Sequence, residues 1–210
     1  MSEVDHFLGR IFATVPLFSK LEIHSAVSVE MHSFEQTDGD NPISNLVQGT
    51  DGNFYGTASY GGKYSNFGTV FKITPSGKFT TVQNFDSTDG SYPYAGLIQA
   101  TNGKFYGATF AGGTSTACSY GCGTVFSLSV GLGPFVETLP NSGKVGAAIR
   151  ILGTDLTGAT SVSFNGTAAK FKVISNSEIE TNVPSGATTG TVEVTTKNTL
   201  KSNVVFRVTK

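Results

Sequence analysis

The chain has 210 residues, a formal net charge of −1 and a sequence pI near 6.3, so it has no basic field to attract phosphate backbones or anionic lipid. Nucleic acid and membrane surfaces are therefore not expected partners. Glycine is frequent, at 26 residues, and charged residues make up only 14%, a balance that favours turn-linked strands over helix. No run of 18 apolar residues predicts a membrane-spanning helix.

Residues 1–27 contain one apolar stretch, Ile11–Phe18, which follows the acidic residues Glu3 and Asp5. A secretory signal would have a basic leader and a small-residue cleavage site, and this segment shows neither. We interpret the segment as the remnant of an earlier repeat and assign it no function.

Residues 28–133 contain an internal repeat. The phrase Asp51-Gly-Asn-Phe-Tyr-Gly56 returns as Asn102-Gly-Lys-Phe-Tyr-Gly107, 51 residues further along the chain. Both copies continue to a Gly-Gly pair and then to Gly-Thr-Val-Phe, which ends at Phe71 in the first copy and at Phe126 in the second. Self-similarity of this period is the sequence signature of a repeat architecture.

Each copy is expected to form four short strands: one near Leu46-Val47, the Phe-Tyr-Gly strand, the Thr-Val-Phe-Lys-Ile strand, and one over Lys78–Phe85. Four strands in about fifty residues is the size of a propeller blade. The Gly-Gly pairs are expected to adopt positive φ in tight turns. Two copies give about two blades, fewer than a ring needs, so we expect an incomplete propeller. Through its unpaired edges the isolated repeat segment is expected to self-associate, to aggregate or to stay partly unfolded. A solenoid is the main alternative.

The motif Asp-Gly-Asn-Phe-Tyr-Gly-Thr, followed by Gly-Gly and by Gly-Thr-Val-Phe-Lys-Ile-Thr-Pro-Ser-Gly, resembles the GloVer type of bacterial tandem repeat over Val29–Val130. The resemblance implies a propeller-like array in an exported or cell-surface protein, with no assigned reaction. From this resemblance we expect the protein outside the cell or on its surface.

Residues 134–210 are expected to form a second domain, because Gly131-Leu-Gly-Pro134 is a cluster of strand breakers. Six or seven short alternating strands predict a sandwich here, among them Ala148–Leu152, Ser161–Phe164, Ala169–Val173 and Glu178–Val183.

Phrases such as Ile151-Leu-Gly-Thr-Asp-Leu156 and Ser161-Val-Ser-Phe-Asn-Gly166 resemble the immunoglobulin-like IPT/TIG domain. The resemblance implies a structural role. The basic loops of its DNA-binding members have no counterpart in this sequence. The predicted fold is thus all-β, with two propeller-blade-like repeats followed by an immunoglobulin-like β-sandwich.

The second repeat has four more residues than the first between its Gly-Gly pair and its Gly-Thr-Val-Phe strand. This longer loop contains the two cysteines of the chain, Cys118 and Cys122. Two cysteines cannot complete a zinc site, and no histidine stands at a ligand-like spacing, so we expect no metal. In an exported protein we expect a local disulfide, with free thiols as the alternative.

Four aspartates, Asp38, Asp40, Asp86 and Asp89, lie in equivalent loops and are candidates for calcium ligands. Their spacing does not fit an EF-hand loop. The simpler interpretation is that each caps the backbone of its own loop as an Asx turn.

Aromatic side chains near the loops offer a surface for stacking on sugars, and Tyr60, Tyr92, Tyr94 and Phe110 are the candidates for carbohydrate binding. In repeat proteins such aromatics more often fill the core between blades. These two interpretations remain open at the level of sequence.

No nucleophile with a neighbouring base, paired carboxylates or metal-ligand set predicts catalysis or a cofactor. The leading hypothesis is a non-catalytic exported or cell-surface protein that presents loops for adhesion or capture of a carbohydrate or protein ligand. The alternatives are an accessory carbohydrate-binding fragment of a polysaccharide-active enzyme, and the end of a longer repeat array with no independent function.

Overall fold

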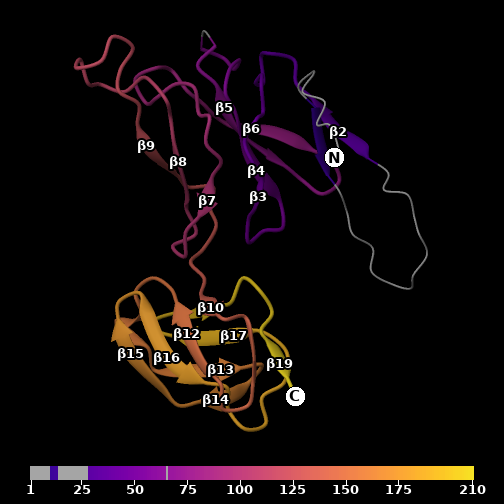
Figure 1. Cartoon of the computed structure of the whole chain (residues 1–210), viewed down its shortest axis with the longest axis vertical. Coiled ribbons are helices and arrows are strands. Elements are labelled where there is room, and N and C mark those ends of the chain that lie inside the picture. The colour runs from indigo at the N-terminus through magenta and orange to yellow at the C-terminus, as the bar shows by residue number, and fades with distance from the viewer. Residues whose placement is uncertain (1–9, 14–27, 65) are drawn as a thin grey trace, which may run out of the picture. The chain divides into compact units, whose positions relative to one another are not determined.

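The computed structural model describes residues 28–64 and 66–210 and the backbone of residues 10–13 (Figure 1). Most of the segment 1–27 therefore lies outside the described residues. All regular elements in the described part are strands, apart from one 3-10 turn, η1 (Leu156–Gly158), which confirms the predicted all-β class. The described part of the chain has no helix that is long and apolar enough to cross a membrane. The described residues divide into two compact units: one comprises those up to residue 99 together with residues 105–130, and the other comprises residues 100–104 and 131–210.

The first unit contains three separate antiparallel sheets, each with its strands in chain order. Strands β1 (Arg10–Ala13) and β2 (Val29–Ser33) form a pair. The first repeat forms a four-stranded sheet of β3 (Val47–Gln48), β4 (Phe54–Ala58), β5 (Thr69–Ile73) and β6 (Phe79–Asn84). The second repeat forms a three-stranded sheet of β7 (Ile98–Gln99), β8 (Phe105–Ala108) and β9 (Val125–Leu128). Such up-and-down sheets have the strand order of propeller blades, and no sheet of the described part closes into a barrel.

The prediction of four strands in each repeat is wrong for the second repeat, which has three. In the first repeat the turn Thr74–Gly77 leads from β5 into β6, and its ends are joined by a hydrogen bond from Gly77 N to the Thr74 carbonyl (2.9 Å). At the corresponding place the second repeat has Gly131-Leu-Gly-Pro134, and the following strand, β10 (Glu137–Leu139), pairs within the second unit. The sheet of the second repeat therefore ends at β9.

The Gly-Gly pairs adopt positive φ in both repeats, as predicted: 71° and 89° at Gly61 and Gly62, and 77° and 86° at Gly112 and Gly113. A Cβ atom on Gly61 would lie 2.4 Å from the Gln36 carbonyl oxygen. Glycine is thus required there both by the backbone angle and by the close approach of the neighbouring loop.

Aromatic side chains form much of the core of the first unit. Phe34 packs edge-on against Phe71 at 5.2 Å between ring centroids, and the equivalent pair Phe85 and Phe126 repeats this contact at 5.1 Å. Between the two repeats, the fully buried Tyr55 packs on Phe105 at 4.2 Å. Phe34 follows β2 and Phe85 follows β6, so each of these contacts also joins one sheet to the next. The repeat sequence thus encodes two kinds of aromatic contact between successive sheets.

The second unit is a β-sandwich. One sheet has the order β10, β12 (Ala148–Leu152), β16 (Glu178–Asn182) and β15 (Phe171–Ser175). The other has the order β14 (Thr167–Ala169), β13 (Ser161–Phe164), β17 (Val192–Thr195) and β18 (Thr199–Lys201). Strands β11 (Ser142–Lys144) and β19 (Arg207–Thr209) pair in parallel.

Alternating residues of the two sheets meet in one core, which includes Ile149 and Ile151 from one sheet and Val162 and Phe164 from the other. The predicted immunoglobulin-like sandwich is confirmed. The single strand expected over Ala169–Val173 is instead two strands, because the chain passes from one sheet to the other near Lys170.

Candidate functional site

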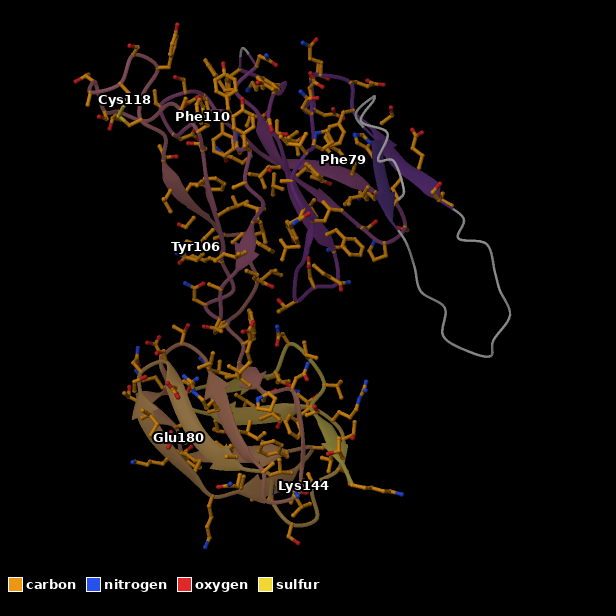
Figure 2. All side chains as sticks on the ribbon, viewed as in Figure 1. Phe79, Tyr106, Phe110, Cys118, Lys144 and Glu180 are labelled. Carbon is orange, nitrogen blue, oxygen red and sulfur yellow. A yellow bond between two sulfur atoms is a disulfide. The ribbon has the colours of Figure 1, made fainter. Side chains whose placement is uncertain are left out.

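The four aromatic residues singled out in the sequence form one cluster on the first unit. Tyr60 lies 5.3 Å from Tyr92 and 6.2 Å from Tyr94 between ring centroids, and Tyr94 lies 5.5 Å from Phe110. The rings of Tyr92 and Tyr94 are nearly parallel, at 16° and 6.4 Å. Figure 2 labels Phe110 near the end of the unit that carries the loop with Cys118. We call these four residues the aromatic cluster.

Backbone hydrogen bonds fix the segments that carry the cluster. Tyr60 follows β4 and pairs with Asp40, and the equivalent bridge in the second repeat joins Ser91 to Ala111. Tyr92 adopts a φ of 58°, donates its N–H to the Phe67 carbonyl (2.9 Å) and accepts the N–H of Phe110 (3.0 Å). The rings therefore project from a framework that both repeats build together.

Part of the cluster faces solvent. The side chain of Phe110 is 70% exposed and that of Tyr94 is 38% exposed, while Tyr60 and Tyr92 are half-buried. The hydroxyls of Tyr60 and Tyr94 lie 2.8 Å apart, and this hydrogen bond raises the pKa of Tyr94 above its usual value. The cluster offers flat apolar faces beside hydroxyl groups, the combination that contacts the ring faces and hydroxyls of a sugar.

Other aromatic residues of the repeats are fully buried, in contrast to the partly exposed cluster. Tyr55 and Phe105 fill the contact between the repeats, and neither is more than 1% exposed. The Tyr55 hydroxyl bonds to Asp51 at 2.9 Å, and burial, with this contact, raises the Tyr55 pKa. Sequence reasoning missed Phe67, whose ring lies 6.5 Å from that of Tyr92. Phe67 has no aromatic counterpart one repeat later, so the repeat pattern gave no signal for it.

A disulfide joins Cys118 and Cys122, with 2.12 Å between the sulfur atoms. The loop it closes is exposed and is tied to the Gly-Gly turn, because Gly112 N donates to the Tyr120 carbonyl (2.8 Å) and Gly123 N donates to the Gly112 carbonyl (3.1 Å). The disulfide thus lies in the extra loop whose base is two residues from Phe110.

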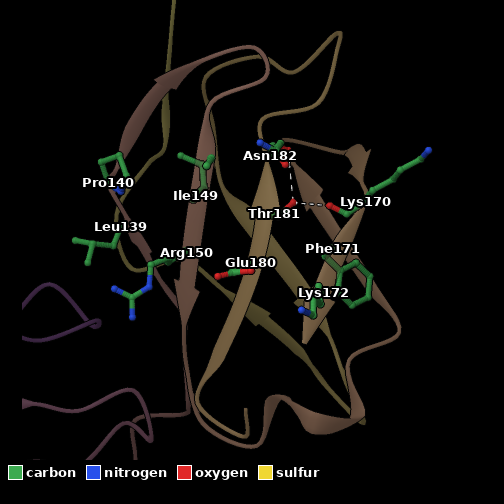
Figure 3. Close-up of a pocket in the computed structure, with 11 residues that line it drawn as sticks. Leu139, Pro140, Ile149, Arg150, Lys170, Phe171, Lys172, Glu180, Thr181 and Asn182 are labelled. Atoms are coloured by element: carbon green, nitrogen blue, oxygen red, sulfur yellow. Dashed lines mark hydrogen bonds between the residues drawn. The ribbon is translucent and has the colours of Figure 1, made fainter. Parts of the chain in front are cut away.

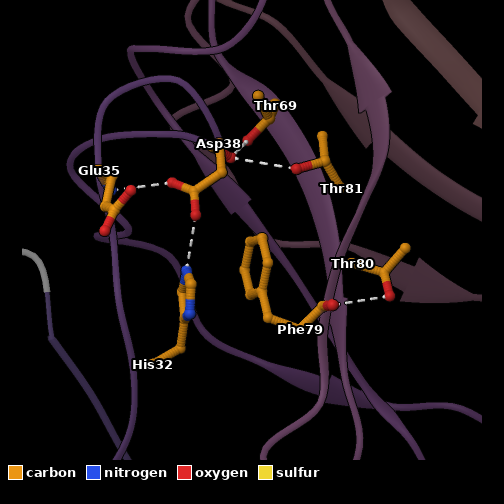
Figure 4. A network of polar contacts seen from close by, with 7 residues as sticks. All are labelled: His32, Glu35, Asp38, Thr69, Phe79, Thr80 and Thr81. Carbon is orange, nitrogen blue, oxygen red and sulfur yellow. Dashed lines mark hydrogen bonds and ion pairs between the residues drawn. The ribbon is translucent and has the colours of Figure 1, made fainter.

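The candidate calcium ligands bond mainly to their own loops, and Figure 4 shows this for Asp38. Asp38 accepts the N–H of Glu35 at 3.0 Å and contacts His32 Nε2 at 2.8 Å. Asp89 accepts the N–H of Asp86 at 3.0 Å and Gln83 Nε2 at 2.7 Å. These are the contacts of loop-capping aspartates.

The two remaining aspartates complete this description. Asp86 accepts both the N–H and the hydroxyl of Thr88, and these bonds lower its pKa. Asp40 contributes its backbone to the bridge with Tyr60. Within the described residues, no three His, Cys, Asp or Glu side chains gather in a way that could hold a metal ion.

The network around Asp38 ties its loop to the first sheet. The Asp38 carbonyl accepts the hydroxyls of Thr69 (3.1 Å) and Thr81 (3.4 Å), as Figure 4 shows. His32 stacks on Phe79 with 3.7 Å between ring centroids. This arrangement has the form of a structural support rather than of a reaction centre.

The second unit carries an open depression of about 700 Å³ between β12, β15 and β16 (Figure 3). Its rim combines charges of both signs, from Arg150, Lys172 and Glu180. Arg150 is paired with Glu178 at 2.6 Å, which raises the arginine pKa and lowers the glutamate pKa. The Thr181 hydroxyl is likewise engaged, since it donates to the Lys170 carbonyl (2.8 Å). Because these lining groups already have partners, we take the aromatic cluster as the stronger candidate.

Comparison with solved structures finds a fold likeness to a copper complex described as a novel fungal alcohol oxidase with catalytic diversity among the AA5 family. The two are 11% identical, with a TM-score of 0.44 over 97% of this chain and 48% of that chain. This chain thus spans about half of that protein, and the likeness is too low to support an argument. No curated protein matches the chain.

Comparison with family models gives two matches. The IPT/TIG domain matches residues 135–208, and the Gloeobacter/Verrucomicrobia repeat matches residues 16–171. Both resemblances noted in the sequence are confirmed. Since the repeat model covers most of its length, the chain belongs to the Gloeobacter/Verrucomicrobia repeat family and carries an IPT/TIG domain after its repeats.

Proposed function

We propose that this protein is a non-catalytic binding protein of the cell surface or extracellular space, and that its repeats capture carbohydrate on the aromatic cluster. The observation that carries the proposal is that Tyr60, Tyr92, Tyr94 and Phe110 lie together on a fixed backbone, with Phe110 70% exposed. The sandwich serves as a structural module beside the repeats.

The exposure of the cluster supports a binding role. Large aromatic side chains are stabilised by burial, as Tyr55 and Phe105 are in the same unit. Exposed apolar rings that lie side by side forgo this stabilisation and are typical of interaction sites. The backbone that carries these rings is also fixed by hydrogen bonds, so little backbone ordering accompanies ligand binding.

The chemistry of the cluster favours a carbohydrate over other ligands. Sugars present apolar C–H faces and a rim of hydroxyl groups, and aromatic rings with polar edges match both. The paired hydroxyls of Tyr60 and Tyr94 supply a donor and an acceptor at the edge of the platform. The cluster contains no charged side chain to select for an ionic ligand.

A non-catalytic role is consistent with where the shifted pKa values lie. Tyr55 and Asp51 share a hydrogen bond at the contact between the repeats, and Asp86 caps its own loop. Arg150 and Glu178 share a surface ion pair, and Tyr94 shares a hydrogen bond with Tyr60. Each shift follows from a structural contact. None belongs to a nucleophile and base that face a shared cavity.

The test is retention of the full chain on insoluble cellulose, chitin and xylan, together with a glycan array. We expect binding to at least one glycan, and we expect the double variant Tyr94→Ala/Phe110→Ala to lose it. Ile98→Ala is the matched control, because Ile98 is an exposed apolar residue of the same unit, 66% exposed, outside the cluster. Failure to bind any glycan, or equal binding by the double variant and the control, would contradict the proposal.

A further inference from the structure

The sheet of the second repeat has an open edge. In the first repeat, β5 pairs with β4 on one side and with β6 on the other. Strand β9 is the equivalent of β5, and among the described residues it pairs only with β8. A strand edge of this kind is a ready site for pairing with another chain.

The same sheet also has an open face. In the first repeat, Tyr55, Thr57 and Val70 share the face that packs on the second repeat, where Thr57 Oγ1 donates to the Ala95 carbonyl (3.1 Å). These three side chains are at most 1% exposed. The equivalent of Val70 is Val125, which is 84% exposed.

Figure 2 shows Tyr106, the equivalent of Tyr55, on the side of the second sheet that faces away from the first. Ile98, on the same sheet, is 66% exposed. The second repeat therefore presents to solvent a face that the first repeat buries against its neighbour. A partner on this face would continue the interface that already joins the two repeats.

Strand β2 has the features of the fourth strand that the second sheet lacks. Strand β2 lies 51 residues before β6 in the sequence, so His32 of β2 is equivalent to Gln83 of β6. Each of these two side chains contacts the aspartate six residues later in the sequence: His32 contacts Asp38 at 2.8 Å and Gln83 contacts Asp89 at 2.7 Å. The pairing of β2 with β1 also resembles the pairing of β6 with β5. Arg10 of β1 faces Ser33 of β2, just as Thr69 of β5 faces Asn84 of β6. In both pairs the register shifts directly after this position.

The present partner of β2 is a weak one. Strands β1 and β2 form a two-stranded sheet, and such a pair is marginal in water without further strands. Pairing with β9 would instead make β2 the outer strand of a four-stranded sheet. It would also cover the edge beside Val125, as β6 covers the edge beside Val70.

The β2 strand that reaches β9 must come from another copy of the chain. Phe34, directly after β2, packs on Phe71, while Tyr55 packs on Phe105 from the opposite face of the first sheet. Gly56 and Phe71 face each other across β4 and β5, so Phe71 and Tyr55 are on opposite faces. The first repeat thus stands between β2 and β9 of the same chain.

We infer that β2 of one copy pairs with β9 of a second copy, in the register of β6 on β5, and so completes the sheet of the second repeat. The contact is head-to-tail, so it closes a ring or extends into a filament. A closed propeller of about four to eight sheets corresponds to roughly two to four copies of the two repeats. This inference does not depend on the aromatic cluster or on its ligand.

The first test is cross-linking between different single-cysteine variants of the full chain. In the inferred register Val125 faces His32 and neighbours Ser33 of the other copy, so a mixture of Val125→Cys and Ser33→Cys chains should form a dimer with a short bismaleimide. The native cysteines are joined to each other and do not react. A mixture of Val204→Cys and Ser33→Cys is the control, since Val204 is 50% exposed on the sandwich. Equal yields from the two mixtures would overturn the inference.

Sedimentation velocity provides the second test. The wild-type chain should form a concentration-dependent oligomer, and Val125→Lys should weaken it by about tenfold or more, because a charge is placed on the pairing strand. Val204→Lys should leave it unchanged, and both variants should keep the wild-type circular dichroism spectrum. A wild-type chain that stays monomeric at all concentrations, or an oligomer equally affected by both variants, would overturn the inference.

Discussion

Asp38 and Asp89 lie 51 residues apart and hold their loops with the same bonds. Each accepts the backbone N–H of the residue three positions earlier at 3.0 Å, and each contacts a side chain six positions earlier, His32 or Gln83. Their carbonyl oxygens accept the hydroxyls of Thr69 and Thr124, which are also equivalent in the repeat. The repeat is thus preserved between the two copies at the level of single hydrogen bonds.

Replacing Asp89 should destabilise the repeat unit. Asp89→Ala removes the acceptor for the Asp86 N–H and the Gln83 amide, so we expect the free energy of unfolding to fall by about 1–2 kcal/mol. Urea denaturation measures the change. Asp40→Ala is the control, because Asp40 joins the bridge to Tyr60 through its backbone. An equal loss in both variants would mean that the Asp89 bonds contribute nothing specific.

The contact between Tyr55 and Phe105 should be the main link between the repeats. Both rings are fully buried and 4.2 Å apart, so Phe105→Ala should lower the free energy of unfolding by about 3–5 kcal/mol. Phe54→Ala, at the equivalent position of the first repeat, should cost less, because Phe54 is only half-buried. Differential scanning calorimetry should show the loss in the transition of the repeat unit. A larger loss for Phe54→Ala would contradict the assignment.

Acid should weaken the first repeat through Asp51. Partial burial acts to raise the pKa of Asp51, but hydrogen bonds from Asn53 and Tyr55 outweigh it and hold the pKa below its usual 3.8. The ionised Asp51 carboxylate therefore stabilises the folded state at pH values above its unfolded-state pKa, and this stabilisation is lost as the pH falls below about 4.

Asp51→Asn gives the test, since asparagine occupies the equivalent position, Asn102, in the second repeat. The variant should be less stable than the wild type at neutral pH, by about 1 kcal/mol. The difference should shrink as the pH is lowered to about 3. A difference in unfolding free energy that stays constant with pH would show that the Asp51 charge does not contribute.

The disulfide between Cys118 and Cys122 should protect both thiols in protein made in an oxidising compartment. Intact-mass analysis after alkylation without reductant should show no alkyl group. Because the two cysteines are only four positions apart, reduction should lower the free energy of unfolding by no more than about 2 kcal/mol. Two alkyl groups on the folded, unreduced protein would exclude the disulfide.

Local patterns in the sequence predict most of the fold, because strand alternation, turn glycines and the 51-residue period are local properties. They fail where a residue's role depends on its neighbours in space. Tyr55 and Tyr106 occupy the same repeat position, yet only Tyr55 is fully buried, since the second repeat covers it. Likewise, the second repeat has no fourth strand because the next strand of the chain, β10, pairs with β12 in the sandwich.

In the candidate site, too, the residue types follow from the sequence but their spatial arrangement does not. The sequence identifies Tyr60, Tyr92, Tyr94 and Phe110 as ring-bearing loop residues, but their meeting depends on the bridge between residues 40 and 60 and on the Tyr92–Phe110 hydrogen bond. Phe67 joins them through a loop contact that no repeat pattern predicts.

The central claim is that the aromatic cluster binds carbohydrate, and the tyrosines allow a direct measurement of it. The chain has seven tyrosines and no tryptophan, so ring-labelled tyrosine gives a simple NMR spectrum of the full chain. Titration with soluble oligosaccharides of cellulose, chitin and xylan should shift the signals of Tyr60, Tyr92 and Tyr94 in a saturable way. The signal of the buried Tyr55 should remain in place. No shift with any of these sugars, or saturable shifts confined to tyrosines outside the cluster, would contradict the claim.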